Sequence, residues 1–489
     1  MQSARSSSVR RALQGICRNG NPTRTASTSC PPGAALCSPG RAISHRLLQQ
    51  GGLRPRQSAL AAVPSLSSVT TTIRHGSSSS PSSSEPLAKT PLYDFHLSKG
   101  GKMVPFGGFH MPVQYAGLSV SQSHIFTREH ASIFDVSHMV QRIFSGPGAA
   151  SFLERVTPSG IAALQPHKST LSVLLHADGS GGIVDDTIIT RLPGEEDKFY
   201  VVTNAACREK DDEYFEGEME KWNGEHAEKE VRQEQLDGWG LVALQGPDAK
   251  AVLAQVLDES SGLDLSKLYF GRSGYAKLKL RGMKLSSPVL ISRGGYTGED
   301  GFEISIPADE TVDVTEALLA AGPDKVQLAG LGARDSLRLE AGMCLYGHDL
   351  NDSTTPVEAG LSWIIPKERR TPDAGFYGAD VISGQLVTKS KGGTGVSTRR
   401  VGFIVEGAPA REGAEIVSRE PGEDGKPVKL GVVTSGCPSP TLGKNIAMGY
   451  IKDGFHKAGT EVDVVVRGRA RKAVVSKMPF VPTGYYREA

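Results

Sequence analysis

The chain carries the stretch SRGGYTGEDGFEI at residues 292–304, in which glycines lead through Gly-Glu-Asp-Gly into alternating apolar and polar residues. Two further segments combine glycine turns with charged side chains: GGIVDD at residues 181–186 and GLGARDSLRLEAG at residues 330–342. Together the three segments place two carboxylates and one arginine beside tight glycine turns. These are the groups needed to hold a flat, nitrogen-rich heterocycle next to an acid that handles protons.

The 292–304 stretch predicts a hairpin turn at Gly-Glu-Asp-Gly that leads into a strand. Because successive side chains of a strand point to opposite faces, Phe302 and Ile304 face the core while Glu303 faces the other side. There the carboxylate can accept two parallel hydrogen bonds from the edge of an amidine-like ring, and each such charged bond contributes ~1.5–3 kcal/mol. A solvent-facing Glu303 on an edge strand fits this segment equally well, so both interpretations stay open.

The GGIVDD segment predicts a glycine turn that feeds a strand rich in β-branched residues. Asp185 and Asp186 then point to opposite faces, so only one of them can face a pocket, and the sequence alone does not choose between them. Asp is also common in turns and caps after Gly, where neither carboxylate would have a chemical role.

The 330–342 segment predicts a helix that is entered after Gly332. Arg334 then lies in the first turn, where a cation opposes the helix dipole at a cost of a few tenths of a kcal/mol unless an anion lies opposite. This position is compatible with a binding role for Arg334. It is equally compatible with a salt bridge to Asp335 or another nearby acid.

The first 84 residues contain no Asp, Glu or Lys but ten Arg and many Ser. This composition is typical of an organelle transit peptide. A secretory signal needs an uninterrupted apolar run of ~7–15 residues, and Arg, Gly, Pro and Ser interrupt every candidate. A merely disordered basic tail would not explain Arg without Lys or acids. We therefore predict an organelle import leader over residues 1–84, cleaved between residues 73 and 84. The absence of a disulfide framework is compatible with a reduced interior such as the mitochondrial matrix, which is the expected location.

The ten arginines of the leader offset the negative net charge of the remaining chain. The full sequence has 55 Lys and Arg against 53 Asp and Glu, and since ten Arg and no acid lie in the leader, the remainder has an excess of eight acids. An acidic body without a Lys/Arg stripe argues against nucleic-acid binding. No run of 18 apolar residues occurs, so no membrane-spanning segment is predicted.

The sequence motifs predict no metal and no redox cofactor. Cys207, Cys344 and Cys437 are isolated in the body, and the other three cysteines lie in the leader. The sequence has no CxxC pair, zinc-ligand spacing or HExxH motif. It also lacks a GxGxxG after a strand and a GxxxxGK[ST] loop, so neither flavin nor nicotinamide is expected.

Strands and helices alternate irregularly along the body, which favours an α+β fold over a doubly wound parallel sheet. From residue 399 the pattern changes to short apolar strands separated by Gly, Pro and Lys, for example at residues 401–405 and 461–466. This spacing predicts a small β-barrel or sandwich over residues 399–486. Polar residues, including TKSKGGTGVST at 388–398, predict a linker over residues 367–398.

These segments, in this order, resemble the aminomethyltransferase of the glycine cleavage system, its T protein, over nearly the whole chain after the leader. The other matching segments are FDVSHM at 134–139, LQGP at 244–247, Thr354, Pro356 and Glu358 with LSW at 361–363, TSGCPSPTL at 434–442 and SKMPFVP at 476–482. The resemblance implies a three-lobed α+β fold with a folate-binding hole between the lobes and a C-terminal barrel. We expect residues 87–366 to form two intertwined lobes, residues 87–139 with 233–366, and residues 140–232.

The resemblance also implies a reaction. The one-carbon unit of the aminomethyl group on the lipoyl arm of H protein passes to tetrahydrofolate, giving 5,10-methylenetetrahydrofolate, ammonia and dihydrolipoyl H protein. Tetrahydrofolate is thus the expected co-substrate, and H protein a transient partner within the glycine cleavage complex. The residues that match the family's site are Asp186 as the key acid, Glu303 and Arg334 as groups that grip the pterin, and Tyr296, Trp363, Met139, Leu171, Asn204 and Tyr485 as residues that line or close the folate site.

Two related classes are compared with this one. The folate-binding half of sarcosine and dimethylglycine dehydrogenases has the same fold but follows an N-terminal flavin domain, for which this chain has neither room nor motif. A noncatalytic folate-binding assembly factor for iron–sulfur proteins is marked by Lys-Gly-Cys-Tyr-x-Gly-Gln-Glu, whereas this chain has RGGYTGED at residues 293–300. Separately, Asp135, Ser137 and His138 are too close in sequence for a nucleophilic triad, so His138 is interpreted as structural.

Overall fold

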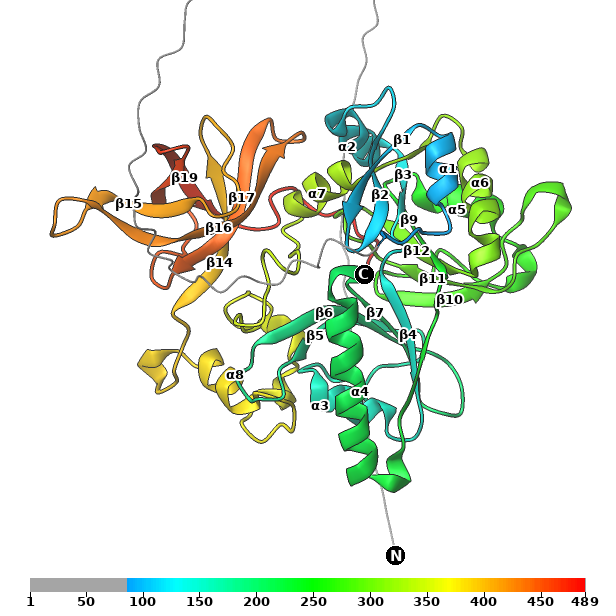
Figure 1. Cartoon of the computed structure of the whole chain (residues 1–489), viewed down its shortest axis with the longest axis horizontal. Coiled ribbons are helices and arrows are strands. Elements are labelled where there is room, and N and C mark those ends of the chain that lie inside the picture. Colours follow the sequence, from blue (N-terminus) through cyan, green and yellow to red (C-terminus); the bar gives the residue numbers. More distant parts are fainter. Residues whose placement is uncertain (1–85, 489) are drawn as a thin grey trace, which may run out of the picture. The chain divides into compact units, whose positions relative to one another are not determined.

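The computed structural model describes residues 86–488 (Figure 1). The predicted transit peptide and its cleavage region lie outside these residues. The helices of the described part are α1 (Tyr93–Ser98), α2 (Val120–Glu129), α3 (Ala149–Val156), α4 (Arg208–Glu225), α5 (Ala249–Val256), α6 (Thr311–Ala321), α7 (Leu331–Glu340) and α8 (Ala379–Leu386). Within residues 86–488, no helix combines the length and the apolar character that a membrane crossing requires.

A six-stranded sheet contains β3 (Ala131–Asp135), β9 (Gly240–Gln245), β10 (Arg272–Ala276), β11 (Val289–Arg293), β12 (Gly301–Ile306) and β13 (Val326–Leu328). The strands lie in the order β10-β11-β12-β9-β3-β13, and all pairs are antiparallel except β13 with β3. Val252 of α5 and Leu318 of α6 share a buried cluster with Phe302 and Ile304, as their spacing predicts. Because β12 lies inside the sheet, Glu303 is not on an edge strand.

A second, five-stranded antiparallel sheet contains β4 (Val140–Ser145), β5 (Ser169–Leu175), β6 (Ile183–Arg191), β7 (Lys198–Thr203) and β8 (Arg232–Gln235), in the order β5-β6-β7-β4-β8. Helices α3 and α4 supply Phe152 and Phe215 to the core of this sheet, where both rings pack against Phe144 of β4. The helix α4 therefore covers one face of the sheet and leaves the other face for different contacts.

Helix α7 joins these parts. It contacts a separate two-stranded ribbon of β1 (Gly101–Phe106) and β2 (Phe109–Tyr115). At the helix entrance, Gly330 approaches β2 so closely that a Cβ would lie 2.5 Å from the carbonyl carbon of Val113. Ala333 and Leu337 share a buried cluster with Tyr200 of the second sheet and with residues of the first. The first turn of α7 is thereby held where the two sheets meet.

The C-terminal part is a closed six-stranded barrel, which confirms the predicted barrel. Its strands are β14 (Thr398–Val405), β15 (Glu415–Pro421), β16 (Pro427–Ser439), β17 (Lys444–Lys452), β18 (Glu461–Val466) and β19 (Arg469–Ser476). The order β14-β17-β16-β15-β18-β19 closes because β14 pairs with both β17 and β19. Ile446 and Met448 of the barrel pack against Leu339 of α7, so the same helix also contacts the barrel.

The predicted linker, residues 367–398, contains more ordered structure than its polar composition indicates. Helix α8 lies within it, and Phe376, Ile382 and Val396 are buried in a cluster with Ile183 of β6. The apolar side chains of this segment gather in residues 374–387, between polar stretches. Their common burial follows from tertiary contact with the second sheet, which composition does not register.

Candidate active site

Strand β6 places the two aspartates of GGIVDD on opposite faces of the second sheet. Asp186 lies opposite Val173 of β5, on the face that also carries the partly exposed Ile188. Asp185 is fully buried on the other face, where Asp211 of α4 lies close to it. Asp186 is therefore the aspartate on the more open face of the sheet.

Asn204, which follows β7, connects the two aspartates. Its side-chain nitrogen Nδ2 donates to Oδ1 of Asp185 over 2.8 Å and to Oδ1 of Asp186 over 2.9 Å. Its backbone N–H donates to Oδ2 of Asp185 over 2.8 Å. Burial, together with the charge of Asp185, raises the pKa of Asp186 to about 7. At neutral pH the Asp186 carboxyl group is therefore able both to hold and to release a proton.

Tyr296 lies in the loop between β11 and β12. This loop turns at Gly295 and Gly298, whose φ angles of 151° and 83° favour glycine. A Cβ at Gly295 would also lie 1.9 Å from the side chain of Gln245. The Tyr296 hydroxyl donates to the carbonyl oxygen of Cys344, so the ring is held both by the loop and at its tip.

Helix α7 places Arg334 against this ring. The guanidinium carbon lies 4.8 Å from the centroid of Tyr296, which is a cation–π distance. Asp335 pairs with Arg338 over 2.9 Å, so the alternative of an Arg334–Asp335 salt bridge is not realised. Atom Nη1 of Arg334 is buried and has no hydrogen-bond partner among residues 86–488. A buried, unpaired guanidinium N–H is a donor that a ligand can satisfy.

Glu303 of β12 and Arg334 of α7 interact through their opposite charges. Burial raises the pKa of Glu303 and lowers that of Arg334, and in each case the charge of the other residue opposes the shift. Burial also raises the pKa of Tyr296, and the negative charge of Asp186 is among the further causes. The acid on β6 and the charged pair on β12 and α7 are thus within electrostatic reach of the same tyrosine.

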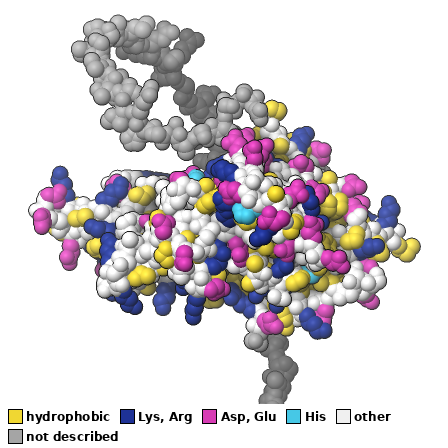
Figure 2. Space-filling view, turned by 90° about the horizontal axis from the view of Figure 1, so that it is seen from below, with side chains coloured by type: hydrophobic (Ala, Val, Ile, Leu, Met, Phe, Trp, Pro, Cys, Tyr) yellow, Lys and Arg dark blue, Asp and Glu magenta, His cyan; other side chains and the backbone are white. Residues whose placement is uncertain are grey.

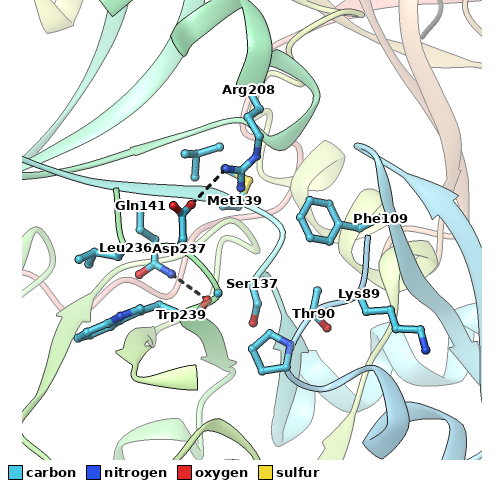
Figure 3. Close-up of a pocket in the computed structure, with 13 residues that line it drawn as sticks. Lys89, Thr90, Phe109, Ser137, Met139, Gln141, Arg208, Leu236, Asp237 and Trp239 are labelled. Carbon is cyan, nitrogen blue, oxygen red and sulfur yellow. Dashed lines mark hydrogen bonds and ion pairs between the residues drawn. The ribbon is translucent and has the colours of Figure 1, made fainter. Parts of the chain in front are cut away.

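Met139 lies in the wall of a small pocket (Figure 3). In the close-up the pocket also holds Phe109 and Ser137, and Arg208 pairs with Asp237 at 3.8 Å. Met139 packs against the buried cluster that contains Ala333 and Leu337 of α7. This side chain therefore lies between the pocket and the helix that carries Arg334.

Leu171 and Trp363 have different surroundings. Leu171 of β5 lies directly opposite Ile188, on the face of the sheet that carries Asp186. Trp363 is 64% exposed and lines a separate cavity at the edge of the barrel, together with Arg399 and Lys477. The structure therefore brings Leu171 to the face of the acid, but places Trp363 at a different opening.

Tyr485 belongs to the C-terminal segment that follows the barrel. The neighbouring Gly484 donates its backbone N–H to the carbonyl of Gly298 over 2.8 Å, which fastens this segment to the loop of Tyr296. The Tyr485 ring lies 4.3 Å from the ring of Phe270. Its hydroxyl is buried and has no partner in the described part of the chain.

Arg128 of α2 was not singled out by its sequence context, yet it holds this site together. Its Nη1 donates to the carbonyl of Thr297 and to Glu299, and its Nη2 donates to Glu340 of α7, each over 2.8 Å. The loop of Tyr296 and the helix of Arg334 are therefore bound to one guanidinium. These partners lie at least 169 residues away in sequence, so no local pattern marks the residue.

His138 is not part of a triad. The Asp135 carboxylate accepts hydrogen bonds from Thr90 and His96 instead. Burial lowers the pKa of His138 to about 4, and the positive charge of Arg334 adds to this shift. Its Nδ1 is buried without a partner among the described residues. His138 is therefore a neutral ring near Arg334.

No group of three or more His, Cys, Asp or Glu side chains that could hold a metal ion occurs among residues 86–488. On the face that Figure 2 presents, acidic and basic side chains are interspersed.

The geometry can be compared with known proteins. The family model described as the GCVT N-terminal domain matches residues 92–369. The model described as the glycine cleavage T-protein C-terminal barrel domain matches residues 399–482. The two matches together cover both sheets, helix α7 and the barrel, and so include every candidate site residue except Tyr485.

Relatives that share most of the chain have consistent names. A probable mitochondrial aminomethyltransferase of Schizosaccharomyces pombe is 49% identical over 409 residues, covering 84% of this chain and 97% of the relative. The mitochondrial aminomethyltransferase of Saccharomyces cerevisiae is 46% identical, with 82% and 96% covered. The glycine cleavage system aminomethyltransferase T of Bartonella henselae, a crystal structure, matches with a TM-score of 0.70 at 37% identity, covering 82% of this chain and all of the other. The chain therefore belongs to the glycine cleavage T-protein family of aminomethyltransferases.

Proposed function

We propose that this aminomethyltransferase passes the one-carbon unit from the aminomethyl group on the lipoyl arm of H protein to tetrahydrofolate, in the mitochondrial matrix. The products are 5,10-methylenetetrahydrofolate, ammonia and dihydrolipoyl H protein. The observation that carries the proposal is that Tyr296 lies within electrostatic reach of both Asp186 and Arg334, while Arg334 in turn faces Glu303. A carboxyl group with a near-neutral pKa is thereby combined with a desolvated clamp for a flat polar ring.

The clamp fits the pterin part of a folate. The Glu303 carboxylate can accept two N–H groups from the amidine-like edge of the ring, and the unpaired Nη1 of Arg334 can donate to a ring acceptor. Tyr296 and Arg334 together offer a flat surface for stacking. Because the charged groups are already desolvated, a ligand that pairs with both recovers hydrogen bonds that the buried side chains lack.

Asp186 has the chemistry that the transfer requires. The folate amine needs a free lone pair to accept the carbon, and the departing nitrogen needs a proton. A carboxyl group with a pKa of about 7 can orient the first and help to deliver the second. Its negative form also stabilises a cationic, iminium-like transition state, since burial strengthens the electrostatic interaction.

The partner and the location follow from the reaction and from the relatives. The carbon arrives on a lipoyl arm, so H protein must dock transiently and insert this arm within the glycine cleavage system. The relatives described above are named as mitochondrial proteins. The acid-free, Arg-containing leader supports import into the matrix.

The test mixes the purified chain with tetrahydrofolate and aminomethylated H protein, and measures ammonia and methylenetetrahydrofolate together. Equal release of both products is the expected result. A known aminomethyltransferase serves as the positive control for the H protein preparation. Folate binding without release, while the control is active, would contradict the transfer reaction and favour a noncatalytic folate-binding protein.

A further inference from the structure

The amide of Asn204 has both of its N–H groups occupied by the protein. Nδ2 donates to Asp185 and to Asp186, and an Asn amide has only two such hydrogens. Since ionised carboxylates can only accept, these partners fix the amide with its nitrogen toward the aspartates. Oδ1 of Asn204 makes no hydrogen bond to the described residues and is left as the free end of the amide.

We propose that Asp185 is a positioning residue for the transfer reaction and acts through Asn204, an inference that rests on the proposed role of Asp186. Asp185 accepts from both the backbone and the side chain of Asn204, and so holds the amide in one orientation. In this orientation Nδ2 steadies the Asp186 carboxylate and Oδ1 accepts an N–H from the substrate. The substrate group that fits is a secondary or protonated amine, the type of nitrogen that gains or loses the carbon.

Asp211 of α4 lies next to Asp185. Asp211 is fully buried, and neither of its carboxyl oxygens has a hydrogen-bond partner among the described residues. Burial and the charge of Asp185 raise the pKa of Asp211 to about 9. Asp211 is therefore protonated at neutral pH, so a neutral carboxyl group lies beside Asp185, whose own pKa is also raised by burial.

Other titratable groups surround these aspartates. They are Cys207 and Lys210 beside α4, Tyr296 in the β11–β12 loop, and Cys344 and Tyr346 after α7. Burial raises the pKa of the two tyrosines and of Cys207, and raises that of Cys344 to about 11. Lys210 is paired with Asp352 over 3.1 Å. His176 also faces this group, because its Nε2 lies 2.9 Å from Asp352, so the pH profile is compared between variants rather than interpreted on its own.

The test compares Asp185→Asn with Thr187→Val in the purified chain, using tetrahydrofolate and aminomethylated H protein. An amide at position 185 cannot accept from both N–H groups of Asn204, so we expect turnover at saturating folate to fall roughly 10–100-fold, while folate affinity stays within about threefold. The acid limb of the pH profile should move to lower pH, because a negative charge beside Asp186 is lost. Thr187 lies on the same buried face and donates to the carbonyl of Val202 over 2.8 Å. Thr187→Val should lower thermal stability without moving the pH profile.

A second variant keeps the inference testable if Asp185→Asn does not fold. Asn204→Ala removes the link itself, so it should reduce turnover by a similar factor, and combining it with Asp185→Asn should add little further loss. Native turnover in Asn204→Ala, or an Asp185→Asn protein with an unchanged pH profile, would overturn the inference. Two outcomes distinguish a failure of this inference from a failure of the proposed function. Native turnover in Asp186→Asn contradicts the role of the acid. Loss of turnover in Asp186→Asn, with native turnover in Asp185→Asn, contradicts only the role of Asp185.

Discussion

The guanidinium carbon of Arg334 lies 4.8 Å from the ring centroid of Tyr296, although the two residues belong to different elements, α7 and the β11–β12 loop. The ring is fixed at its hydroxyl by the carbonyl of Cys344, and the buried Nη1 of the guanidinium has no hydrogen-bond partner among residues 86–488. The tyrosine therefore fixes the plane of the guanidinium while leaving its hydrogen-bonding capacity for a ligand. Such preorganisation lowers the ordering cost of binding a flat heterocycle.

Tyr296→Phe should weaken folate binding by a modest factor. The variant keeps the ring but loses the hydrogen bond to Cys344, a bond that contributes ~1 kcal/mol, so the ring and the guanidinium against it become less well fixed. We expect the dissociation constant of tetrahydrofolate to rise about fivefold, measured by calorimetry. Tyr275→Phe, at a partly exposed tyrosine on β10, is the matched control. Equal affinities of Tyr296→Phe and the parent would show that the hydroxyl does not position the clamp.

Glu303→Ala should affect binding more than turnover. The change removes the acceptor of two charged hydrogen bonds that contribute ~1.5–3 kcal/mol each, so folate affinity should fall at least about tenfold. Turnover at saturating folate should remain within roughly threefold of the parent, because Glu303 is assigned to binding. Glu310→Ala removes a carboxylate in the turn between β12 and α6, where it accepts from Ser287, and should leave folate affinity unchanged. An unaltered affinity in Glu303→Ala would remove the residue from the folate site.

Asp186→Asn should show the opposite pattern. An amide keeps the shape of the side chain but can neither release a proton nor stabilise a cation by charge, so turnover should fall roughly 10²–10⁴-fold. Folate affinity should change little, since Glu303 and Arg334 supply the clamp. The control is Asp178→Asn, in the exposed turn before β6. The measurement is single-turnover formation of methylenetetrahydrofolate, and a rate near that of the parent would refute the assignment.

The pH dependence of turnover follows from the same carboxyl group. The pKa of Asp186 is raised to about 7, so the group is largely ionised above this pH and increasingly protonated below it. If the ionised form orients the folate amine and stabilises the cationic transition state, turnover at saturating substrates should decline as the pH falls below about 7. The profile should be measured from about pH 5.5 to pH 8.5, with the folded state verified at each end. A flat profile would exclude titration of Asp186 as a rate-determining factor.

Local sequence patterns were sufficient where a feature depends on neighbouring residues. The period of two at Phe302, Glu303 and Ile304 correctly predicted that the apolar side chains enter the core of the first sheet. The short apolar strands after residue 399 likewise predicted a barrel, because each strand alternates between an interior and an exterior face. In both cases the chemistry of adjacent residues and the geometry of a strand determine the outcome.

Features that depend on contacts between residues far apart in the sequence could not be predicted from local patterns. Asp185 and Asp186 could not be distinguished by pattern, because the choice depends on which face of the second sheet is covered by α4. Arg128 was missed because its acceptors lie in a loop and a helix far along the chain. The burial of Ile382 was missed because only contact with β6 reveals it within a polar segment.

Asp211 provides a prediction about stability rather than turnover. Its pKa is raised from 3.8 to about 9 in the folded chain, so between these values the folded state binds a proton that the unfolded state releases. The stabilisation that this proton provides is fully present below the unfolded pKa and is lost as the pH rises toward 9.

The Asp211→Asn variant has no titrating group at position 211, so its stability should decline less as the pH rises. Relative to the parent, its free energy of unfolding should increase by roughly 4 kcal/mol between about pH 5 and pH 8, measured by chemical denaturation. Asp212→Asn, one position along α4 and partly exposed, tests whether any change of charge on this helix has the same effect. A constant difference between Asp211→Asn and the parent at all pH values would mean that Asp211 does not hold this proton in the folded chain.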